Sequence, residues 1–411
     1  MRKSLGIWVL PVLLLWLASF SGLRADGVEA VVNANNRFAF ELYSQLIKTE
    51  KGNVFFSPLS LETALGMAYE GARGKTARQM ERVCRFPAND RQRRQAFQTL
   101  LRDFNRPDPA YKLSIANALW GQKGYPFRPA YLGVLRDFYL AQAASLDFKN
   151  KPEQAAKTVN DWVDKNTAGM IHRIISPADI EQYTSLILTN AVYFKGEWEK
   201  KFDSMLPGGY SLKPEAVLLR FALASGKKFI INGMTGGGEK KYFKNRDWQM
   251  VELPYRGKRF SMLILLPKKN NLAELERRFS LSQLNQFRKA MKPQSVQVVM
   301  PKFNLSCMYD RLSVSMQEMG MKLPFKPFSA DFSGMAGNKT LFLDSIVHKA
   351  VIKVNEEGTE AAAVTAVVVK SLGEVVVPIE FRADHPFLFL IRDHETGAIL
   401  FLGRVMDPRA H

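Results

Sequence analysis

Cysteine is scarce in this chain of 411 residues: only Cys84 and Cys307 occur, far apart in the sequence. A fold built on disulfide bridges is therefore excluded, and stability has to come from packing. Whether the two thiols meet depends on geometry. Hydrophobic residues make up 46% of the chain, which supplies a substantial core and argues against wholesale disorder.

Histidine is also scarce, and no set of catalytic or metal-binding residues is apparent. The five histidines are not spaced as metal ligands, and neither a Gly-x-Ser-x-Gly turn nor a His-Glu-x-x-His helix occurs. The Gly-rich segment 233–241 is close to a phosphate-binding loop, but Glu239 stands where lysine is required, so we expect a flexible loop. We expect a protein that is not an enzyme and needs no metal or cofactor.

No apolar run reaches the roughly 20 residues that a membrane-spanning helix needs. The run from Leu5 to Phe20 follows Arg2 and Lys3 and leads to small residues ending at Ala25. This pattern predicts a signal peptide over residues 1–25 and a secreted or periplasmic protein, with an uncleaved anchor as the alternative. Residues 26–411 show no repeat, low-complexity tract or linker, which predicts one domain.

Local patterns predict several elements along the chain. Ser57 before Pro58 marks the start of a helix, with serine as N-cap and proline in the first turn. Further helices are expected over 31–47, from 76, from 91 and over 155–175, and strands over 184–194, 251–255, 260–267, 387–391 and 399–403.

The chain is organised around the stretch from Asn355 to His385, and within it the segment from Thr359 to Val369 reads as a strand. Its residues have strand propensity, small at first and β-branched later, and alternation gives it one uncharged face. Yet it lies between a Glu356-Glu357-Gly358 hinge and a polar tip that contains Gly373, which is typical of an exposed loop. These two properties indicate a peptide with two locations, one outside a sheet and one within it.

This pattern resembles the reactive-centre loop of the serpins. The hinge of an inhibitory member is matched by Glu356, Glu357, Gly358, Thr359, Glu360, Ala361, Ala362 and Ala363. A second match is the run Leu188–Trp198, and from Val298 the likeness is nearly continuous. The sequence of residues 206–243 departs from the family pattern, so we expect an enlarged or remodelled loop there. The resemblance implies an α+β serpin fold with three β-sheets, eight or nine helices and an exposed loop over about 356–380.

The resemblance also implies a function. A protease cleaves the loop, becomes acylated, and is trapped when the cleaved strand inserts into the main sheet, so the protein would be a monomeric suicide inhibitor of serine proteases, with cysteine proteases as a further class of target. Counting from the hinge places the bond at Leu372-Gly373, which suits chymotrypsin-like or elastase-like enzymes. Lys370-Ser371, which suits trypsin-like enzymes, and Val369-Lys370 remain alternatives, and so does a non-inhibitory carrier or chaperone.

Three groups of residues take roles from the resemblance. It places Ser57, Asn190 and His348 together beneath the centre of the main sheet, and Trp198, Lys302 and Glu356 at the end of that sheet where the loop begins. The net charge of +19, from 58 Lys and Arg against 39 Asp and Glu, favours anionic partners. Serpins bind polyanions such as glycosaminoglycans on the helix that here carries Arg91, Arg93, Arg94 and Arg102, although a solvated basic face is the simpler interpretation; no nucleic-acid partner is expected.

Overall fold

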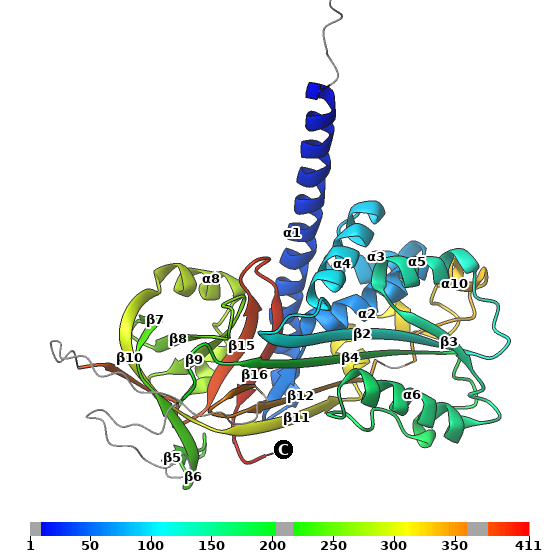
Figure 1. The fold of residues 1–411 in the computed structure, drawn as a ribbon. Helices are drawn as coiled ribbons and strands as arrows, with labels where there is room; N and C mark the ends of the chain where they lie inside the picture. The colour runs from blue at the N-terminus through cyan, green and yellow to red at the C-terminus, as the bar shows by residue number, and fades with distance from the viewer. Residues whose placement is uncertain (1–9, 203–216, 345, 360–376, 411) are drawn as a thin grey trace, which may run out of the picture.

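The computed structural model describes residues 10–202, 217–344, 346–359 and 377–410. In these residues ten α-helices surround two β-sheets, which confirms the expected α+β class and is one or two helices more than expected (Figure 1). The helices are α1 (Leu10–Thr49), α2 (Pro58–Gly71), α3 (Gly74–Cys84), α4 (Asp90–Phe104), α5 (Pro129–Tyr139), α6 (Pro152–Asn166), α7 (Leu272–Glu276), α8 (Leu281–Ala290), α9 (Leu312–Glu318) and α10 (Ser333–Ala336).

The first sheet has six strands, and its long central pair is antiparallel. The spatial order is β11 (Phe303–Tyr309), β12 (His348–Val354), β13 (Gly358–Thr359), β4 (Leu186–Glu197), β2 (Tyr111–Gln122) and β3 (Gln142–Leu146). β2 and β4 pair along almost their whole length, from Tyr111 opposite Gly196 to Gly121 opposite Leu186. The two-residue β13 is the short member, and it lies between the longer β12 and β4.

The second sheet is formed by ten strands and contains what sequence reasoning expected as two separate sheets. Its order is β1 (Val54–Phe56), β16 (Ile399–Val405), β15 (Phe387–Asp393), β9 (Phe260–Pro267), β8 (Trp248–Pro254), β7 (Glu239–Lys244), β10 (Lys292–Pro301), β6 (Lys228–Gly236) and β5 (Leu218–Ala222), with β14 (Ile379–Arg382) also on β10. The first half of β10 pairs with β7 and its second half with β6. This change of partner joins the two parts into one hydrogen-bonded sheet.

The structure of segment 206–243 differs from two expectations, the remodelled loop over this segment and the flexible loop over 233–241. Residues 203–216 lie outside the described part of the chain, but the rest of the segment consists of strands β5, β6 and the start of β7. The Gly-rich stretch 233–241 is therefore not a flexible loop: Gly233 to Gly236 end β6, and β7 begins at Glu239. Glycine is favoured at this turn because Gly238 has a φ of 125°, a region that other residues rarely adopt.

α2 crosses the centre of the molecule, and every one of its residues is buried. Its start confirms the prediction, since Ser57 is the N-cap, its Oγ accepts a hydrogen bond from the N–H of Ser60 (3.4 Å), and Pro58 occupies the first turn. The helix expected from Thr76 instead begins at Gly74, because the Thr76 hydroxyl accepts the N–H of Asp331 (2.9 Å) and does not cap a helix.

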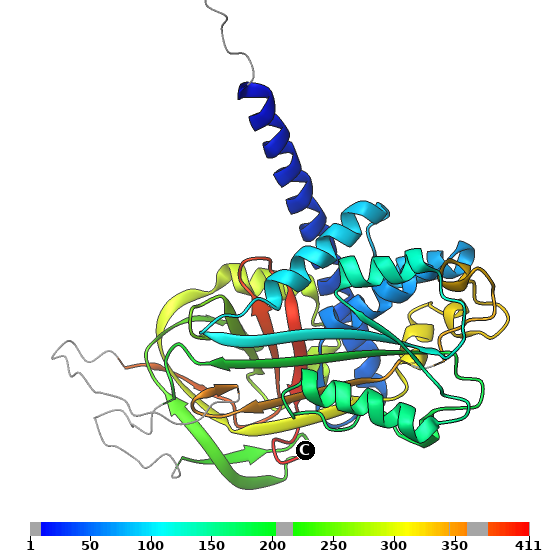
Figure 2. The same ribbon diagram turned by 45° about the vertical axis from the view of Figure 1, so that its right-hand side comes forward.

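α6 covers one face of the six-stranded sheet, opposite α2, α4 and α5 (Figures 1 and 2). Its buried side chains, among them Val159 and Val163, pack with Trp120 of β2 and Ala191 of β4. The helix was expected to continue to residue 175 but ends at Asn166, because the next residues include left-handed backbone at Ala168 and Gly169. A second cluster of apolar residues is thereby completed by Ile171, Ile174 and Ile175.

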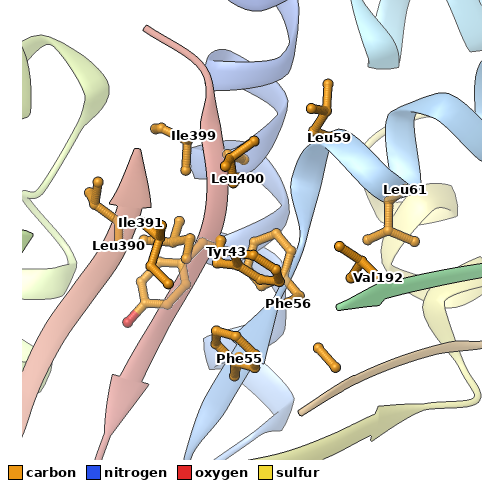
Figure 3. Close-up of a cluster of buried hydrophobic side chains, with 14 of the residues drawn as sticks. Tyr43, Phe55, Phe56, Leu59, Leu61, Val192, Leu390, Ile391, Ile399 and Leu400 are labelled. Carbon is orange, nitrogen blue, oxygen red and sulfur yellow. The ribbon is translucent and has the colours of Figure 1, made fainter. Parts of the chain in front are cut away.

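The largest core lies where α1, α2 and both sheets meet. Figure 3 shows side chains that converge there from β1, α2, β4, β15 and β16. Phe55 is at the centre of an aromatic stack, with ring centroids 5.7 Å from Phe389 and 5.2 Å from Phe401. β1 has only three residues and is held by its pairing with β16, so these contacts connect the amino-terminal and carboxyl-terminal parts of the chain.

The helix expected over 31–47 lies within the longer α1. Its buried residues Val31, Phe38, Leu42 and Leu46 pack into the core, and the part of α1 that precedes them extends away from the sheets (Figures 1 and 2). Among the described residues, none of the helices combines the length and the apolar character needed to span a bilayer.

Phe55→Ala is expected to lower the free energy of unfolding by about 3–5 kcal/mol, because it leaves a cavity between two aromatic rings in a core that cannot collapse freely. The measurement is urea unfolding followed by circular dichroism. The matched control is Phe328→Ala, since Phe328 is 99% exposed, and there the change should stay within about 0.5 kcal/mol. Equal effects of the two substitutions would contradict this description of the core.

Candidate functional site

β13 connects β12 and β4 at one end of the six-stranded sheet. Gly358 and Thr359 pair with Glu197 and Gly196 of β4, and Thr359 also pairs with Val354 of β12. Val354 is the last residue of β12 and Glu197 the last of β4. The last residue of the Glu356-Glu357-Gly358 hinge and the first residue of the segment from Thr359 thus lie within the sheet, at the end where β12 and β4 finish.

Gly358 approaches the backbone of β4 so closely that no other residue fits. A Cβ atom at this position would lie 2.1 Å from the carbonyl oxygen of Gly196 and 2.7 Å from the Cα of Glu197. The φ of Gly358 is 153°, and its N–H donates to Oδ1 of Asn355 (3.2 Å), which closes the turn before β13. The glycine expected as a hinge is therefore required by contact with the neighbouring strand.

Thr359 is enclosed by the sheet and only 1% exposed. Its hydroxyl forms a hydrogen bond of 2.7 Å with the hydroxyl of Tyr255. The ring of Tyr255 stacks on Trp198 with centroids 4.6 Å apart. The position thus has room and a partner for a small hydroxyl, and a charged side chain there would lose its solvation.

Two ion pairs hold the backbone just before β13. Glu356 pairs with Lys302, as sequence reasoning expected, and Glu357 pairs with Lys201, which it did not identify. All four side chains are between 20% and 30% exposed, so each pair is partly shielded from solvent. The signal for Lys201 would have been the run Glu199-Lys200-Lys201, which follows β4 and Trp198, next to the expected position of the hinge.

Trp198 fixes the same turn through backbone contacts. Its indole Nε1–H donates to the carbonyl of Asn355 (2.9 Å), and its backbone N–H donates to the carbonyl of Glu357 (2.9 Å). The N–H of Phe202 donates to the carbonyl of Glu356 (2.9 Å). The structure thus brings Trp198, Lys302 and Glu356 to one turn. Trp198 bonds to main-chain carbonyls of the turn, and Lys302 pairs with the side chain of Glu356.

A second polar group lies beneath the middle of the sheet and is fully buried. The N–H of Ser57 donates to Nε2 of His348 (3.2 Å). Asn190 contacts the first turn of the same helix through Ser60, whose hydroxyl donates to Oδ1 of Asn190. Nδ2 of Asn190 donates to Oδ1 of Asn117 (2.6 Å). The three expected residues therefore lie near one another: Ser60 connects Ser57 to Asn190, and Asn117 is a further partner of Asn190.

Those two residues were missed, although each had a signal in the sequence. Ser60 stands three positions after the N-cap Ser57, one helical turn away. Asn117 is in register opposite Asn190 across the β2–β4 ladder. The first follows from helical spacing, whereas the second depends on strand pairing.

The remaining loop residues lie outside the described part of the chain. These are Glu360, Ala361, Ala362 and Ala363 of the hinge and Lys370, Ser371, Leu372 and Gly373 around the candidate bonds. The described chain resumes at Val377, which is 82% exposed, and continues into β14.

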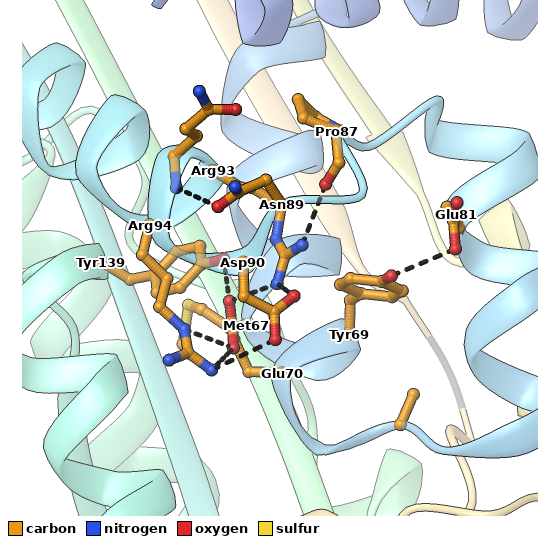
Figure 4. Close-up of polar contacts among 12 residues, drawn as sticks. Met67, Tyr69, Glu70, Glu81, Pro87, Asn89, Asp90, Arg93, Arg94 and Tyr139 are labelled. Atoms are coloured by element: carbon orange, nitrogen blue, oxygen red, sulfur yellow. Dashed lines mark hydrogen bonds and ion pairs between the residues drawn. The ribbon is translucent and has the colours of Figure 1, made fainter. Parts of the chain in front are cut away.

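The basic helix α4 corrects part of the polyanion prediction (Figure 4). Arg93 is buried and donates to Oε1 of Glu70 (2.9 Å), while Arg94 donates through two nitrogens to Oε2 (2.7 and 2.9 Å). Tyr139 adds a hydrogen bond to Glu70 (2.9 Å), and Asp90 lies 2.8 Å from Arg93. Arg93 is therefore part of a buried polar cluster and is not available to an external anion.

Arg91 and Arg102 remain exposed on α4. Arg94 is 29% exposed, but its guanidinium is occupied by Glu70. The four-arginine surface expected from the sequence is reduced to two free arginines on this helix.

The described residues contain no group of three His, Cys, Asp or Glu side chains that could hold a metal ion. Cys84 and Cys307 are free thiols, and Cys84 is buried. Burial raises the pKa of the Cys307 thiol to about 11, which disfavours the reactive thiolate.

Glu70→Gln should lower the free energy of unfolding by about 3 kcal/mol, because it leaves the buried charge of Arg93 without its main counter-charge. Glu41→Gln is the control: its pair with Arg85 has side chains 40% and 44% exposed, and its loss should cost at most about 1 kcal/mol. Both variants are compared by urea unfolding. A Glu70→Gln effect as small as the control would show that the cluster does not carry this energy.

Burial lowers the pKa of His348 from 6.5 to about 3, so the folded protein holds this imidazole neutral. Between these values the unfolded chain binds more protons than the folded one, and stability present above pH 6.5 is lost as pH falls toward 3. We expect His348→Gln to flatten the decline of the thermal midpoint between pH 7 and pH 4. The control His172→Gln, at a side chain 81% exposed, should keep the wild-type slope; a His348→Gln slope equal to it would disprove the assignment.

The geometry agrees with comparisons to known proteins. The family profile Serpin (serine protease inhibitor) matches residues 33–408. An uncharacterized serpin-like protein of Thermococcus kodakarensis is 42% identical over 390 residues, 94% of this chain and 88% of that protein. The leukocyte elastase inhibitor of Bos taurus is 37% identical over 394 residues, 93% of this chain and 100% of that protein.

The fold has close counterparts among solved structures. Human thyroxine-binding globulin superposes with a TM-score of 0.82 at 27% identity, over 93% of this chain and 99% of that one. The match of the family profile extends from α1 almost to the end of the chain, and it includes both sheets and the β13 turn. This chain belongs to the serpin family.

Proposed function

We propose that this protein is a suicide inhibitor of serine proteases. The protease attacks the loop between β13 and β14 and forms an acyl-enzyme, and the cleaved strand then inserts between β12 and β4 before the ester is hydrolysed. Insertion adds backbone hydrogen bonds along both strands and buries an uncharged face. The attached protease is carried with the strand and its active site is distorted.

The observation that carries this proposal is the position of Gly358 and Thr359 between β12 and β4. Insertion would extend a pairing that the intact chain has already begun, so the strand does not need a new starting point. The next residues in the sequence include Ala361, Ala362 and Ala363, whose small side chains would follow without steric obstruction. The similarity to leukocyte elastase inhibitor supports protease inhibition as the activity.

We propose Leu372-Gly373 as the cleaved bond, which favours chymotrypsin-like or elastase-like targets because their primary pockets accept apolar side chains. Lys370-Ser371 is the alternative and would suit a trypsin-like target. The mass of the peptide released by the protease decides between them.

A carrier is the second candidate, favoured by one comparison: thyroxine-binding globulin was solved with thyroxine. The two candidates differ in the fate of the loop, because an inhibitor forms a covalent complex that survives detergent and a carrier is only cleaved. We further propose that residues 1–25 are a cleaved signal peptide and that the protein is secreted. Any polyanion partner would have to use Arg91 and Arg102 together with basic residues outside α4.

Thr359→Arg is expected to convert the inhibitor into a substrate, because a guanidinium cannot be accommodated in the enclosed site beside Tyr255, so the pairing from which insertion would proceed is lost. The protein is mixed with elastase, chymotrypsin or trypsin, and the products are separated on denaturing gels. The wild-type chain should give a covalent band with at least one of them, and Thr359→Arg should give at least tenfold less complex and correspondingly more cleaved chain.

Thr359→Ser is the matched control, since it keeps the hydroxyl that contacts Tyr255, and it should retain complex formation. Full inhibition by Thr359→Arg would show that insertion does not depend on the position of this residue between β12 and β4. A wild-type chain that all three enzymes only cleave would favour the carrier function.

A further inference from the structure

A cavity of about 460 Å³ lies next to the β13 turn, at the end of the six-stranded sheet. Part of its wall is apolar and is formed by Trp198, Phe202, Leu253 and Pro254. Trp198 and Phe202 are the residues whose N–H groups hold the carbonyls of the turn before β13. The cavity and the hinge therefore share a wall.

The other part of the wall is rich in charge, mostly positive. The charged residues are Lys200, Lys201, Lys240, Lys241, Lys258, Glu199, Glu239 and Glu252, with His394 beside them. Three of the lysines have acidic partners: Lys201 pairs with Glu357, Lys258 with Glu199 (3.5 Å), and Lys241 with Glu252 (3.6 Å).

Two lysines have no acidic partner among the residues that the structure describes. They are Lys200, shortly after the end of β4, and Lys240, near the start of β7. Nζ of Lys200 lies against Gly238, in the turn between β6 and β7. Burial, with the positive charge of Lys200, lowers the pKa of Lys240 to about 8. Glu239 is exposed and forms no ion pair with a described residue, so the two unpaired lysines exceed this carboxylate by one positive charge.

Two like charges on the rim of a partly apolar cavity favour an anion over a neutral ligand. An anionic group between Lys200 and Lys240 would replace water with charge-assisted hydrogen bonds. An apolar body attached to that group would bury the apolar surface that the wall still exposes, to which the partly exposed Pro254 contributes. The same lysine-lined wall disfavours cations, and the volume limits the ligand to a small molecule.

We propose that this cavity binds a small amphipathic anion, an apolar ring system or short chain that carries one carboxylate or sulfonate, and that binding is linked to the hinge through Lys201. Lys201 lines the cavity and also pairs with Glu357, so a bound anion and Glu357 compete for the same ammonium group. Occupancy thus weakens one of the two ion pairs that hold β13. The regulatory meaning of this link rests on the proposed inhibitory function, whereas the binding does not.

Binding is tested on the intact protein by isothermal titration calorimetry with naphthalene-2-sulfonate as the probe. Lys200→Gln and Lys240→Gln should each weaken the affinity roughly tenfold, the factor associated with one charge-assisted hydrogen bond. Lys268→Gln, an exposed lysine outside the cavity, should leave the affinity unchanged. No binding of the probe, equal binding of the neutral 2-naphthalenemethanol, or full affinity in both cavity variants overturns the site.

The link to the hinge has its own matched pair of variants. Glu357→Gln frees Lys201 and should tighten binding of the probe several-fold, because linked equilibria are reciprocal. Glu356→Gln is the control, since its partner Lys302 does not line the cavity, and its affinity should equal that of the wild type. Equal affinities in the two variants overturn the link. If the probe binds as expected and no protease forms a complex, the cavity site stands and the inhibitory function fails.

Discussion

The close approach of Gly358 to the carbonyl oxygen of Gly196 is the constraint on which the end of the six-stranded sheet at β13 depends. A side chain at position 358 would overlap the backbone of β4, so β13 can lie between β12 and β4 only because this residue is glycine. Once that contact is made, Thr359 reaches Tyr255, and the turn before it is held by Trp198 and by two lysines. The end of the sheet is therefore closed by short, specific contacts and not by a large apolar interface.

Buried polar groups serve two different purposes in this fold. Beneath the sheet, Ser57, Asn190 and His348 use neutral hydrogen bonds, which cost little charge desolvation and can be exchanged when strands move. Around Glu70, by contrast, two arginines share one buried carboxylate, an arrangement that is costly to break. The first group joins the start of α2 to β12 and β4, and the second ties α4 to α2.

Sequence reasoning and structure agree best where a residue's role is local. The capping of α2 by Ser57 and the glycine of the hinge were expected. The pair of Glu356 and Lys302 joins distant positions and was expected only from the family resemblance. Apart from Ser60, the misses involve long-range contacts: Tyr255 contacts Thr359 across 104 positions of sequence. Arg93 illustrates the opposite error, since a basic helix face gave no indication that Glu70, on another helix, would neutralise it.

The sequence by itself determined the helix start at Ser57, the hinge glycine and the motifs that carry the family resemblance, because such patterns act over a few neighbouring positions. The α+β class followed from that resemblance. Tertiary structure alone decided that two expected sheets join through β10, that Arg93 is buried, and that Lys201 stands between the hinge and a cavity. Each of these depends on which distant segments pack together, and a local sequence pattern does not encode which segments those are.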